Sequence, residues 1–308
     1  MLIRRRAVAC VSAALLLLAT ASTLAAQEAK KLSKDEEREV KLLSAALGNA
    51  TSGKPAGGND AGLTWLRQDG LQAQGASNIV AFGVTVDPSK VPSGKIFLAW
   101  RVMPADADPK KKVAPIYENY STADVSGSSP VFIGRLFLAP AGKVDVYIAG
   151  HELVADKGSK APVSLIKQSV DVKALTGGDF MLSSLYVFRP RKYDAPLADI
   201  MEHPYGTPEE ENLPLVSPTL SKTEPLRVNG MIFNATGRVT VEYLAYKDGA
   251  TESFKKWAAA EIDPAKQGIP DRVPLTDFEP GKYRLEIKLT DKGSGKTLTE
   301  SLPFTVGS

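Results

Sequence analysis

Few residues of the chain have the types and spacing that catalysis requires. Its two histidines are His151 and His203. The pair His151-Glu152 begins like a zinc-protease motif, but the second histidine of that motif would have to stand at Ala155. A serine nucleophile would need one of these histidines as its base, and no Gly-x-Ser-x-Gly turn presents such a serine. We therefore predict that the protein is not an enzyme and assign it no catalytic residue.

Two other patterns resemble cofactor-binding or metal-binding motifs, but the residues around them do not fit such sites. The run Gly293–Thr297 resembles the end of a phosphate-binding loop, which needs a further glycine where Thr290 stands and a helix afterwards. The residues that follow alternate like a strand, so we predict a hairpin turn. The acidic run Glu209–Glu211 lies between prolines and is typical of a solvated loop. We expect no cofactor and no bound metal.

The first 26 residues have the three parts of a secretory signal. Arg4–Arg6 precede an apolar core at Ala13–Ala19, and small residues follow up to Ala26. We predict a signal peptide over 1–26 and an exported protein, located in the periplasm, on the cell surface or secreted; a retained N-terminal anchor is the alternative. No later segment has the length of apolar sequence that spans a bilayer, so we expect no membrane span after cleavage. Cys10, the one cysteine, lies in this signal, which leaves no disulfide.

The net charge gives no sign of a polyanionic partner. The chain has 38 basic and 35 acidic residues, and the three arginines of the signal account for the excess. A balanced chain lacks the basic surface that nucleic acids require, so we expect no nucleic-acid partner. The short run Lys110–Lys112 is typical of a solvated loop tip.

The segment 27–62 is predicted to hold a short helix and a Gly-rich linker. Ser33 and Glu36 have the spacing of a capping box, and Gly48-Asn49 is typical of a helix end. Val40, Leu43, Ala46 and Leu47 share one face of this helix. It could dock on the first domain, bind a partner or act as a tether. Thr51–Gly62 is predicted to be flexible.

The rest of the chain has the period-two pattern of β-strands and predicts an all-β protein of two tandem β-sandwich domains, 63–175 and 176–308. In 95–102 one side of the strand, with Trp100 at its centre, is expected to be core. Phe254–Ile262 is ambiguous between a short helix and a strand, and Trp257–Ala260 leans weakly toward the helix. The strands are expected at Ile79–Val86, Lys95–Val102, Val131–Leu138, Val144–Ile148 and Val163–Val172 in the first domain, and at Phe180–Phe188, Leu226–Phe233, Val239–Tyr246, Tyr283–Leu289 and Leu298–Val306 in the second.

A long segment of the second domain, 189–225, contains seven prolines and almost no periodicity. Long loops of this kind in compact domains are usually functional or disordered. Its residues Tyr193, Met201, His203 and Tyr205 have the side chains of contact anchors, so we predict a partner-binding loop. The alternative is a loop that folds over the sandwich.

One motif carries a resemblance to known modules. Phe278–Leu285 is similar to the turn-and-tyrosine pattern of immunoglobulin-like, fibronectin type III-like and transthyretin-like modules of exported bacterial proteins. The resemblance implies that Pro280, Gly281 and Tyr283 form a structural corner between strands. The related segment of the first domain has Val144 where the tyrosine would stand.

Thr64–Leu71, Thr85–Val91 and Tyr283–Asp291 also resemble segments of uncharacterised exported proteins from acidobacteria-like bacteria. This resemblance implies two tandem immunoglobulin-like or fibronectin III-like domains and an exported location. It carries no activity.

These observations predict an exported, non-catalytic binding or assembly protein of the cell envelope, which acts through sandwich edges and the 189–225 loop. Its partner would be another envelope or secreted protein. The alternative is a carbohydrate-binding or degradative accessory protein, with a glycan as its ligand. That function would need aromatic side chains on one exposed face, for which the candidates are Trp65, Tyr117, Tyr120, Tyr193 and Tyr205.

Overall fold

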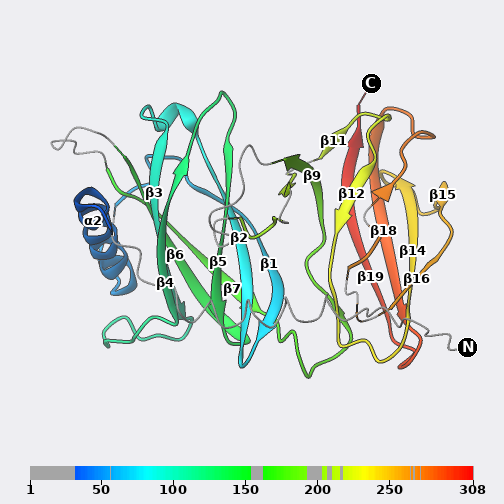
Figure 1. The fold of residues 1–308 in the computed structure, drawn as a ribbon, viewed down its shortest axis with the longest axis horizontal. Helices are drawn as coiled ribbons and strands as arrows, with labels where there is room; N and C mark the ends of the chain where they lie inside the picture. The colour runs from blue at the N-terminus through cyan, green and yellow to red at the C-terminus, as the bar shows by residue number, and fades with distance from the viewer. Residues whose placement is uncertain are drawn as a thin grey trace, which may run out of the picture.

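The computed structural model describes residues 32–55, 57–153, 162–192, 203–206, 210–215, 218–263, 265, 268–270 and 272–307. Figure 1 shows two β-rich halves side by side, the first formed by the N-terminal part of the chain and the second by the C-terminal part. The expected all-β class is confirmed. Within the described residues, no helix is long and apolar enough to cross a membrane. The predicted signal segment lies outside the described residues.

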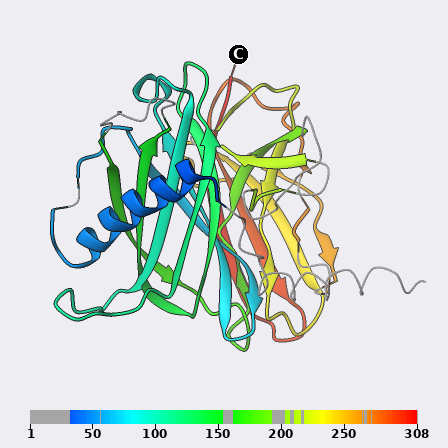
Figure 2. The ribbon, with the colours of Figure 1, turned by 60° about the vertical axis from the view of Figure 1, so that its left-hand side comes forward.

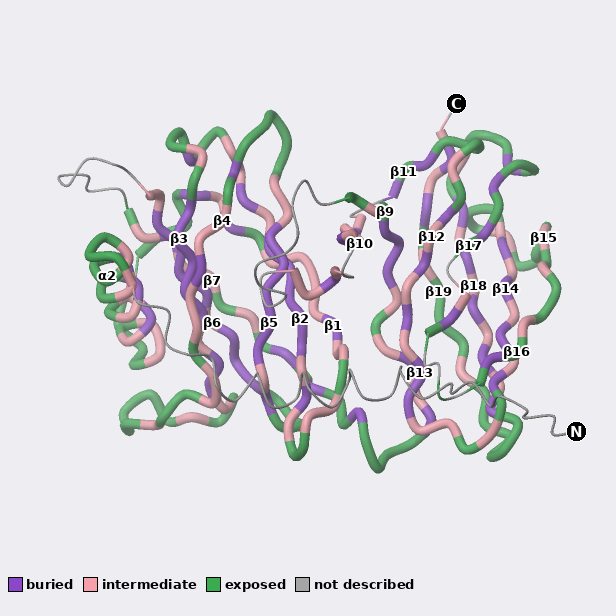
Figure 3. The backbone as a smooth tube through the Cα atoms, viewed as in Figure 1, coloured by how far each residue is buried: buried purple, intermediate pink, exposed green. Residues whose placement is uncertain are grey.

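The first half is a sandwich of two antiparallel sheets. One sheet has the order β1-β2-β5 and the other the order β4-β3-β6-β7. The buried residues of both sheets form one core cluster (Figure 3). Its elements are β1 (Thr64–Gln74), β2 (Ser77–Val86), the 3₁₀ turn η1 (Pro88–Lys90), β3 (Lys95–Pro104), β4 (Tyr117–Asp124), β5 (Val131–Ala139), β6 (Gly142–Glu152) and β7 (Ser164–Val172).

Strand β3 shows how the period-two pattern builds this core. The alternate residues Ile96, Leu98, Trp100 and Val102 are all buried in the sandwich, as predicted. The Trp100 indole Nε1–H also donates to the Leu136 carbonyl, 3.0 Å away in the opposite sheet. A buried indole needs an acceptor, so this bond removes the cost of enclosing its polar end.

The opposite face of β3 and β6 is covered by the helix α2 (Lys34–Thr51). Ser33 caps it, with both bonds of the predicted capping box present. Leu43 and Leu47 are fully buried against the side chains of Phe97, Ala99 and Ala149, and Figure 2 shows the helix lying across this sheet. Of the three possibilities left open for the helix, the structure shows docking on the first sandwich.

A buried contact between a carboxylate and an imidazole accompanies this apolar packing. The Glu39 carboxylate of α2 lies 2.8 Å from His151 Nδ1 of β6, and both side chains are almost inaccessible to solvent. The glycine-rich segment after α2, expected to be flexible, is also attached to the sandwich. Gly58 forms a parallel bridge with Ser164, whose hydroxyl accepts the Ala61 N–H at 2.6 Å. These contacts attach Gly58 and Ala61 to the first sandwich.

The second half has its own hydrophobic core. It contains more strands than the first half, and many of them are shorter. One sheet has the order β10-β9-β12-β17, another the order β11-β19-β18-β14-β15 with β16 also on β14, and β13 pairs with β8. The strands are β8 (Met181–Leu182), β9 (Tyr186–Lys192), β10 (Glu210–Pro214), β11 (Thr219–Leu220), β12 (Leu226–Asn229), β13 (Ile232–Phe233), β14 (Val239–Lys247), β15 (Lys255–Lys256), β16 (Ala260–Ile262), β17 (Arg272–Val273), β18 (Gly281–Asp291) and β19 (Thr297–Val306).

The secondary structure differs from the expectation in several segments. Residues 254–262 leaned weakly toward a helix, but they form β15 and β16 and pair with β14. The ring of Trp257 stacks on Phe278 at 6.1 Å, so tertiary packing outweighs the helix propensity of the alanines beside it. Strand β1 was not predicted, because Gly70 and two register shifts interrupt its alternation. The 189–225 segment also contains the strands β10 and β11.

The turn between β18 and β19 is the predicted hairpin, and Asp291 organises it. The buried Asp291 carboxylate accepts bonds from the backbone and hydroxyl groups of Thr236 and Ser294, and from the N–H groups of Gly237 and Gly293. Burial alone would raise the pKa of this carboxyl, but these hydrogen bonds to its charged form lower the pKa far below its usual value. Asp291 thus joins the hairpin to the loop before β14.

We expect Leu43→Ala to lower the free energy of unfolding by about 3 kcal/mol, because it leaves a cavity under α2. The matched control is Leu42→Ala on the neighbouring residue, whose side chain is 40% exposed; that change should cost less than about 0.5 kcal/mol. Chemical denaturation measures both. Equal effects of the two changes would contradict the docked position of the helix.

We expect Asp291→Asn to destabilise the protein by about 2 kcal/mol at neutral pH. The asparagine amide cannot accept all of the hydrogen bonds that the Asp291 carboxylate accepts from the loop before β14 and from its own hairpin. A lowered folded-state pKa gives stability that is present above the unfolded pKa of about 3.9 and lost as the pH falls below it. The difference between wild type and variant should therefore be constant above about pH 5 and shrink below about pH 4. Denaturation curves across this range measure it; a difference independent of pH would contradict the assignment.

Candidate functional site at the seam between the sandwiches

A buried carboxylate lies where the two sandwiches meet. Asp69 of β1 is 1% exposed. It accepts bonds of 2.6 Å from both Nε and Nη2 of Arg67, and a third of 2.7 Å from the hydroxyl of Tyr205. Arg67 also donates to the carbonyl of Leu185 at 3.3 Å, just before β9. Because a buried charge is tolerated only when it is paired and hydrogen-bonded, this arrangement links the first sandwich to two segments of the second.

Aromatic rings surround the carboxylate. The guanidinium of Arg67 lies 4.5 Å from the centre of the Tyr186 ring, which meets the ring of Tyr205 edge-on at 5.4 Å. Tyr205 also packs against Phe132 of β5 at 5.8 Å. With Ala81 and Phe188, these residues form a separate buried cluster. We call this cluster, together with Arg67 and Asp69, the seam.

Two paired glycines make room for the seam on the first sandwich. Gly83 of β2 lies opposite Gly134 of β5. A Cβ at Gly83 would overlap the ring of Phe132, and one at Gly134 would lie 3.3 Å from atoms of both Pro204 and Tyr205. The absence of side chains here lets the segment 203–206 approach the sheet closely.

The seam keeps its phenols protonated. Burial raises the pKa of Tyr186 to about 12, and the Asn229 amide, which donates to its oxygen, only partly opposes this effect. Burial also raises the pKa of Tyr205 well above its usual value, and the Asp69 charge adds to the effect. The Tyr205 hydroxyl is therefore a hydrogen-bond donor at neutral pH, which is the role that Asp69 requires.

This position corrects the expectation for Tyr205 as a partner-binding residue. The Tyr205 side chain is 3% exposed and makes its contacts inside the molecule. Burial of its ring offsets the conformational entropy that is lost when the residue is ordered. His203 lies 3.1 Å from Glu211, which also accepts a 2.5 Å bond from Arg191. Tyr193 and Met201 lie outside the described residues. The described part 203–206 therefore folds over the sandwich, the alternative that the sequence left open.

The expected corner residues lie at the start of β18, away from the seam. The Tyr283 hydroxyl donates to the Glu279 carbonyl at 2.7 Å, and its ring stacks on Phe304 at 5.5 Å. Pro280 and Gly281 lie in the turn between Glu279 and Tyr283. In the first sandwich, Val144 is buried and makes no such bond, because it has no hydroxyl. Tyr283 thus ties the start of β18 to the preceding turn and to β19 within the second sandwich.

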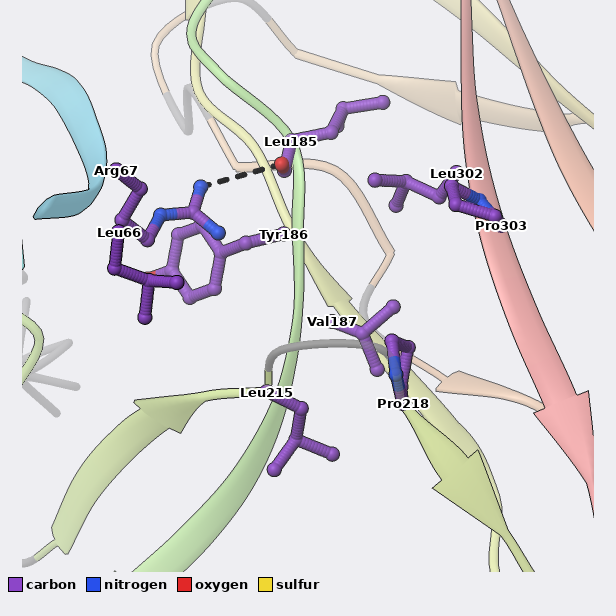
Figure 4. A pocket seen from close by; sticks show the side chains of 9 residues that line it. All are labelled: Leu66, Arg67, Leu185, Tyr186, Val187, Leu215, Pro218, Leu302 and Pro303. Atoms are coloured by element: carbon purple, nitrogen blue, oxygen red, sulfur yellow. Dashed lines mark hydrogen bonds between the residues drawn. The ribbon is translucent and has the colours of Figure 1, made fainter. Parts of the chain in front are cut away.

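A pocket of about 250 Å³ opens beside the seam (Figure 4). Arg67 and Leu66 of the first sandwich lie on one side of it, and Leu302 and Pro303 of β19 on the other. Its lining is mostly apolar, and its one guanidinium is engaged with Asp69 and Leu185. The pocket has room for a small apolar group.

A larger groove of about 940 Å³ also lies between the sandwiches. The first sandwich contributes the end of β4, the loop 126–130 and the start of β5. The second contributes Arg191, Lys192, His203 and the strand β10. We call it the large groove. Residues of both sandwiches line this space.

The histidines do not form a joint site. His151 lies against Glu39 under α2, and His203 lies against Glu211 in the other sandwich. Within the described ranges, no three His, Cys, Asp or Glu side chains gather as metal ligands would. The candidate sugar platform is also dispersed. Trp65, Tyr117 and Tyr120 are half-buried and pack against cores of the first sandwich, Tyr205 is buried, and Tyr193 is outside the described residues.

No protein-family model matches the chain, and the search of curated proteins finds no significant relative.

We expect Tyr205→Phe to lower the free energy of unfolding by about 2 kcal/mol, because a buried charged acceptor loses one of its donors. Asp69→Ala should cost about 3 kcal/mol or more, since it leaves the Arg67 charge without its partner. The control is Tyr246→Phe, because the Tyr246 hydroxyl makes only a 3.3 Å contact with Glu286 in a partly exposed position. Denaturation measures all three. Equal effects of the two tyrosine variants would contradict the assigned role of Tyr205.

Proposed function

We propose that the protein is an exported, non-catalytic binding or assembly protein of the cell envelope, whose two sandwiches together bind another envelope or secreted protein. The observation that carries this proposal is the large groove, whose walls come from both sandwiches. Such a groove keeps its shape only if the sandwiches keep their relative orientation. The bonds that cross between the sandwiches, from the Tyr205 hydroxyl to Asp69 and from Arg67 to the Leu185 carbonyl, favour a fixed orientation.

We further infer that both domains are immunoglobulin-like or fibronectin III-like. In the first sandwich the order β1-β2-β5 against β4-β3-β6-β7 matches that of a fibronectin type III domain. In the second, Tyr283 makes the bond of a tyrosine corner to Glu279. A fold of this class serves many functions, so the domain type supports the proposal only together with the groove. Export rests on the signal-like sequence of residues 1–26.

The engagement of the histidines supports a non-catalytic function. A general base needs a reacting group within hydrogen-bond reach. His151 is enclosed between α2 and β6, and His203 lies beside a carboxylate that an arginine also binds. These pairs explain both histidines as structural contacts.

The test is site-specific photo-crosslinking in the native envelope. A photoreactive residue at Ser128, on the rim of the large groove, should capture a discrete partner protein. That partner, once identified and used as bait, should capture this protein in return. The control position is Lys110, in the loop at the opposite end of the β3–β4 hairpin. Point labelling is preferable to deletion of the 189–225 segment, because its residue Tyr205 belongs to the seam. No protein captured from Ser128, or the same set captured from both positions, would contradict the proposal.

A further inference from the structure

The charges of the large groove indicate the chemistry of its ligand. Among the described residues that line it, four are cationic, Lys95, Arg135, Arg191 and Lys192, and two are acidic, Asp124 and Glu211. The cations come from both sandwiches, so a ligand in the groove meets positive charge on either wall. An excess of cations in a recess attracts and orients an anionic ligand.

Each acidic side chain of the groove already has a cationic partner. Glu211 is buried between Arg191 and His203, and Asp124 lies 3.7 Å from Lys95. Lys192 is exposed at the end of β9. The two carboxylates therefore offset part of the positive charge, and the groove still favours an anion over a cation.

The backbone of the groove indicates the form of the ligand. Among the described strands, β5 is the last of its sheet and pairs only with β2. Its residues Val131–Arg135 line the groove. The unpaired side of a terminal strand presents alternate N–H and C=O groups, to which an extended peptide can add as another strand. The Gly134 carbonyl already accepts a bond from Arg135, so the free stretch of β5 lies nearer Val131.

We infer that the large groove binds an extended acidic peptide segment of the partner protein, which pairs with the edge of β5 and places its carboxylates near Lys95 and Lys192. This inference rests on the proposed function and specifies its ligand. A peptide is favoured over an anionic polysaccharide because the groove offers a strand edge. Phe132, whose ring a sugar could stack on, packs instead against Tyr205.

The test uses a fluorescent peptide of about ten residues that alternates Glu and Val, a length that suits one strand. Fluorescence anisotropy with the purified protein should show saturable binding at about tens of micromolar, weakening as salt is added. The same peptide with two consecutive central prolines should bind at least about tenfold more weakly, because it cannot pair with β5. A Lys/Val peptide should not bind.

Charge reversals locate the binding site. Lys192→Glu and Lys95→Glu should each weaken binding about fivefold or more. The matched control, Lys110→Glu, makes the same change of net charge at the far end of the β3–β4 hairpin and should leave the affinity unchanged. Thermal unfolding of each variant verifies that it is folded.

Three results would overturn the inference: no binding of the acidic peptide up to about 1 mM, equal binding of the proline-containing peptide, or equal effects of Lys192→Glu and Lys110→Glu. Binding of polygalacturonate in place of the peptide would assign the groove to an anionic glycan and would also overturn it. A partner captured from Ser128 together with failure of the peptide would refute this inference alone. Failure of both experiments would refute the proposed function as well.

Discussion

The structure between the two sandwiches depends on one buried charge. Asp69 belongs to the first sandwich, and its oxygens accept bonds from Arg67 and from Tyr205 of the second. A carboxylate without water is expensive to enclose, so these donors must stay in place for the contact to persist. The surrounding rings bury apolar area around this pair. Apolar packing and a satisfied charge together favour one relative position of the sandwiches.

The same contact also covers the outer face of the sheet β1-β2-β5, whose inner face lies on the core of the first sandwich. In β2, residues such as Val80 and Phe82 face the internal core, whereas Ala81 lies in the seam. On the other side of the sandwich, α2 covers the outer face of β3 and β6. The first sandwich thus lies between a helix and a second sandwich, and its accessible parts are chiefly loops and edge strands. The large groove lies at two of these edges, β4 and β5, where the second sandwich adds the opposite wall.

The strands with a regular alternation were predictable from the sequence, because one buried face imposes a period of two. Lys95–Val102 is an example, and the capping box at Ser33 similarly marked the start of α2. Strand β1 was missed, since it has Gly70, two bulges and the polar residues of the seam instead of a clean alternation. Residues 254–262 could not be assigned, because pairing with β14 overrides their local preference.

The seam itself could not be predicted, because it joins residues far apart in the chain. Arg67, Asp69 and Tyr205 have no shared motif, and their meeting depends on how the two sandwiches pack. Tyr205 was noticed for its residue type and was assigned to an external partner. In retrospect, a signal was present in the strand glycines Gly83 and Gly134, which mark a close approach of other groups to a sheet. Sequence alone does not say which groups approach.

The central claim is that the seam holds the sandwiches in one orientation and so gives the large groove a constant shape. The most direct test is the distance between spin labels on cysteines introduced at Ser128 in the first sandwich and Lys222 in the second, both exposed. We expect one narrow distance distribution, which broadens in Asp69→Ala while each sandwich remains folded. A broad distribution in the wild-type protein, or a narrow one unaffected by Asp69→Ala, would contradict the claim.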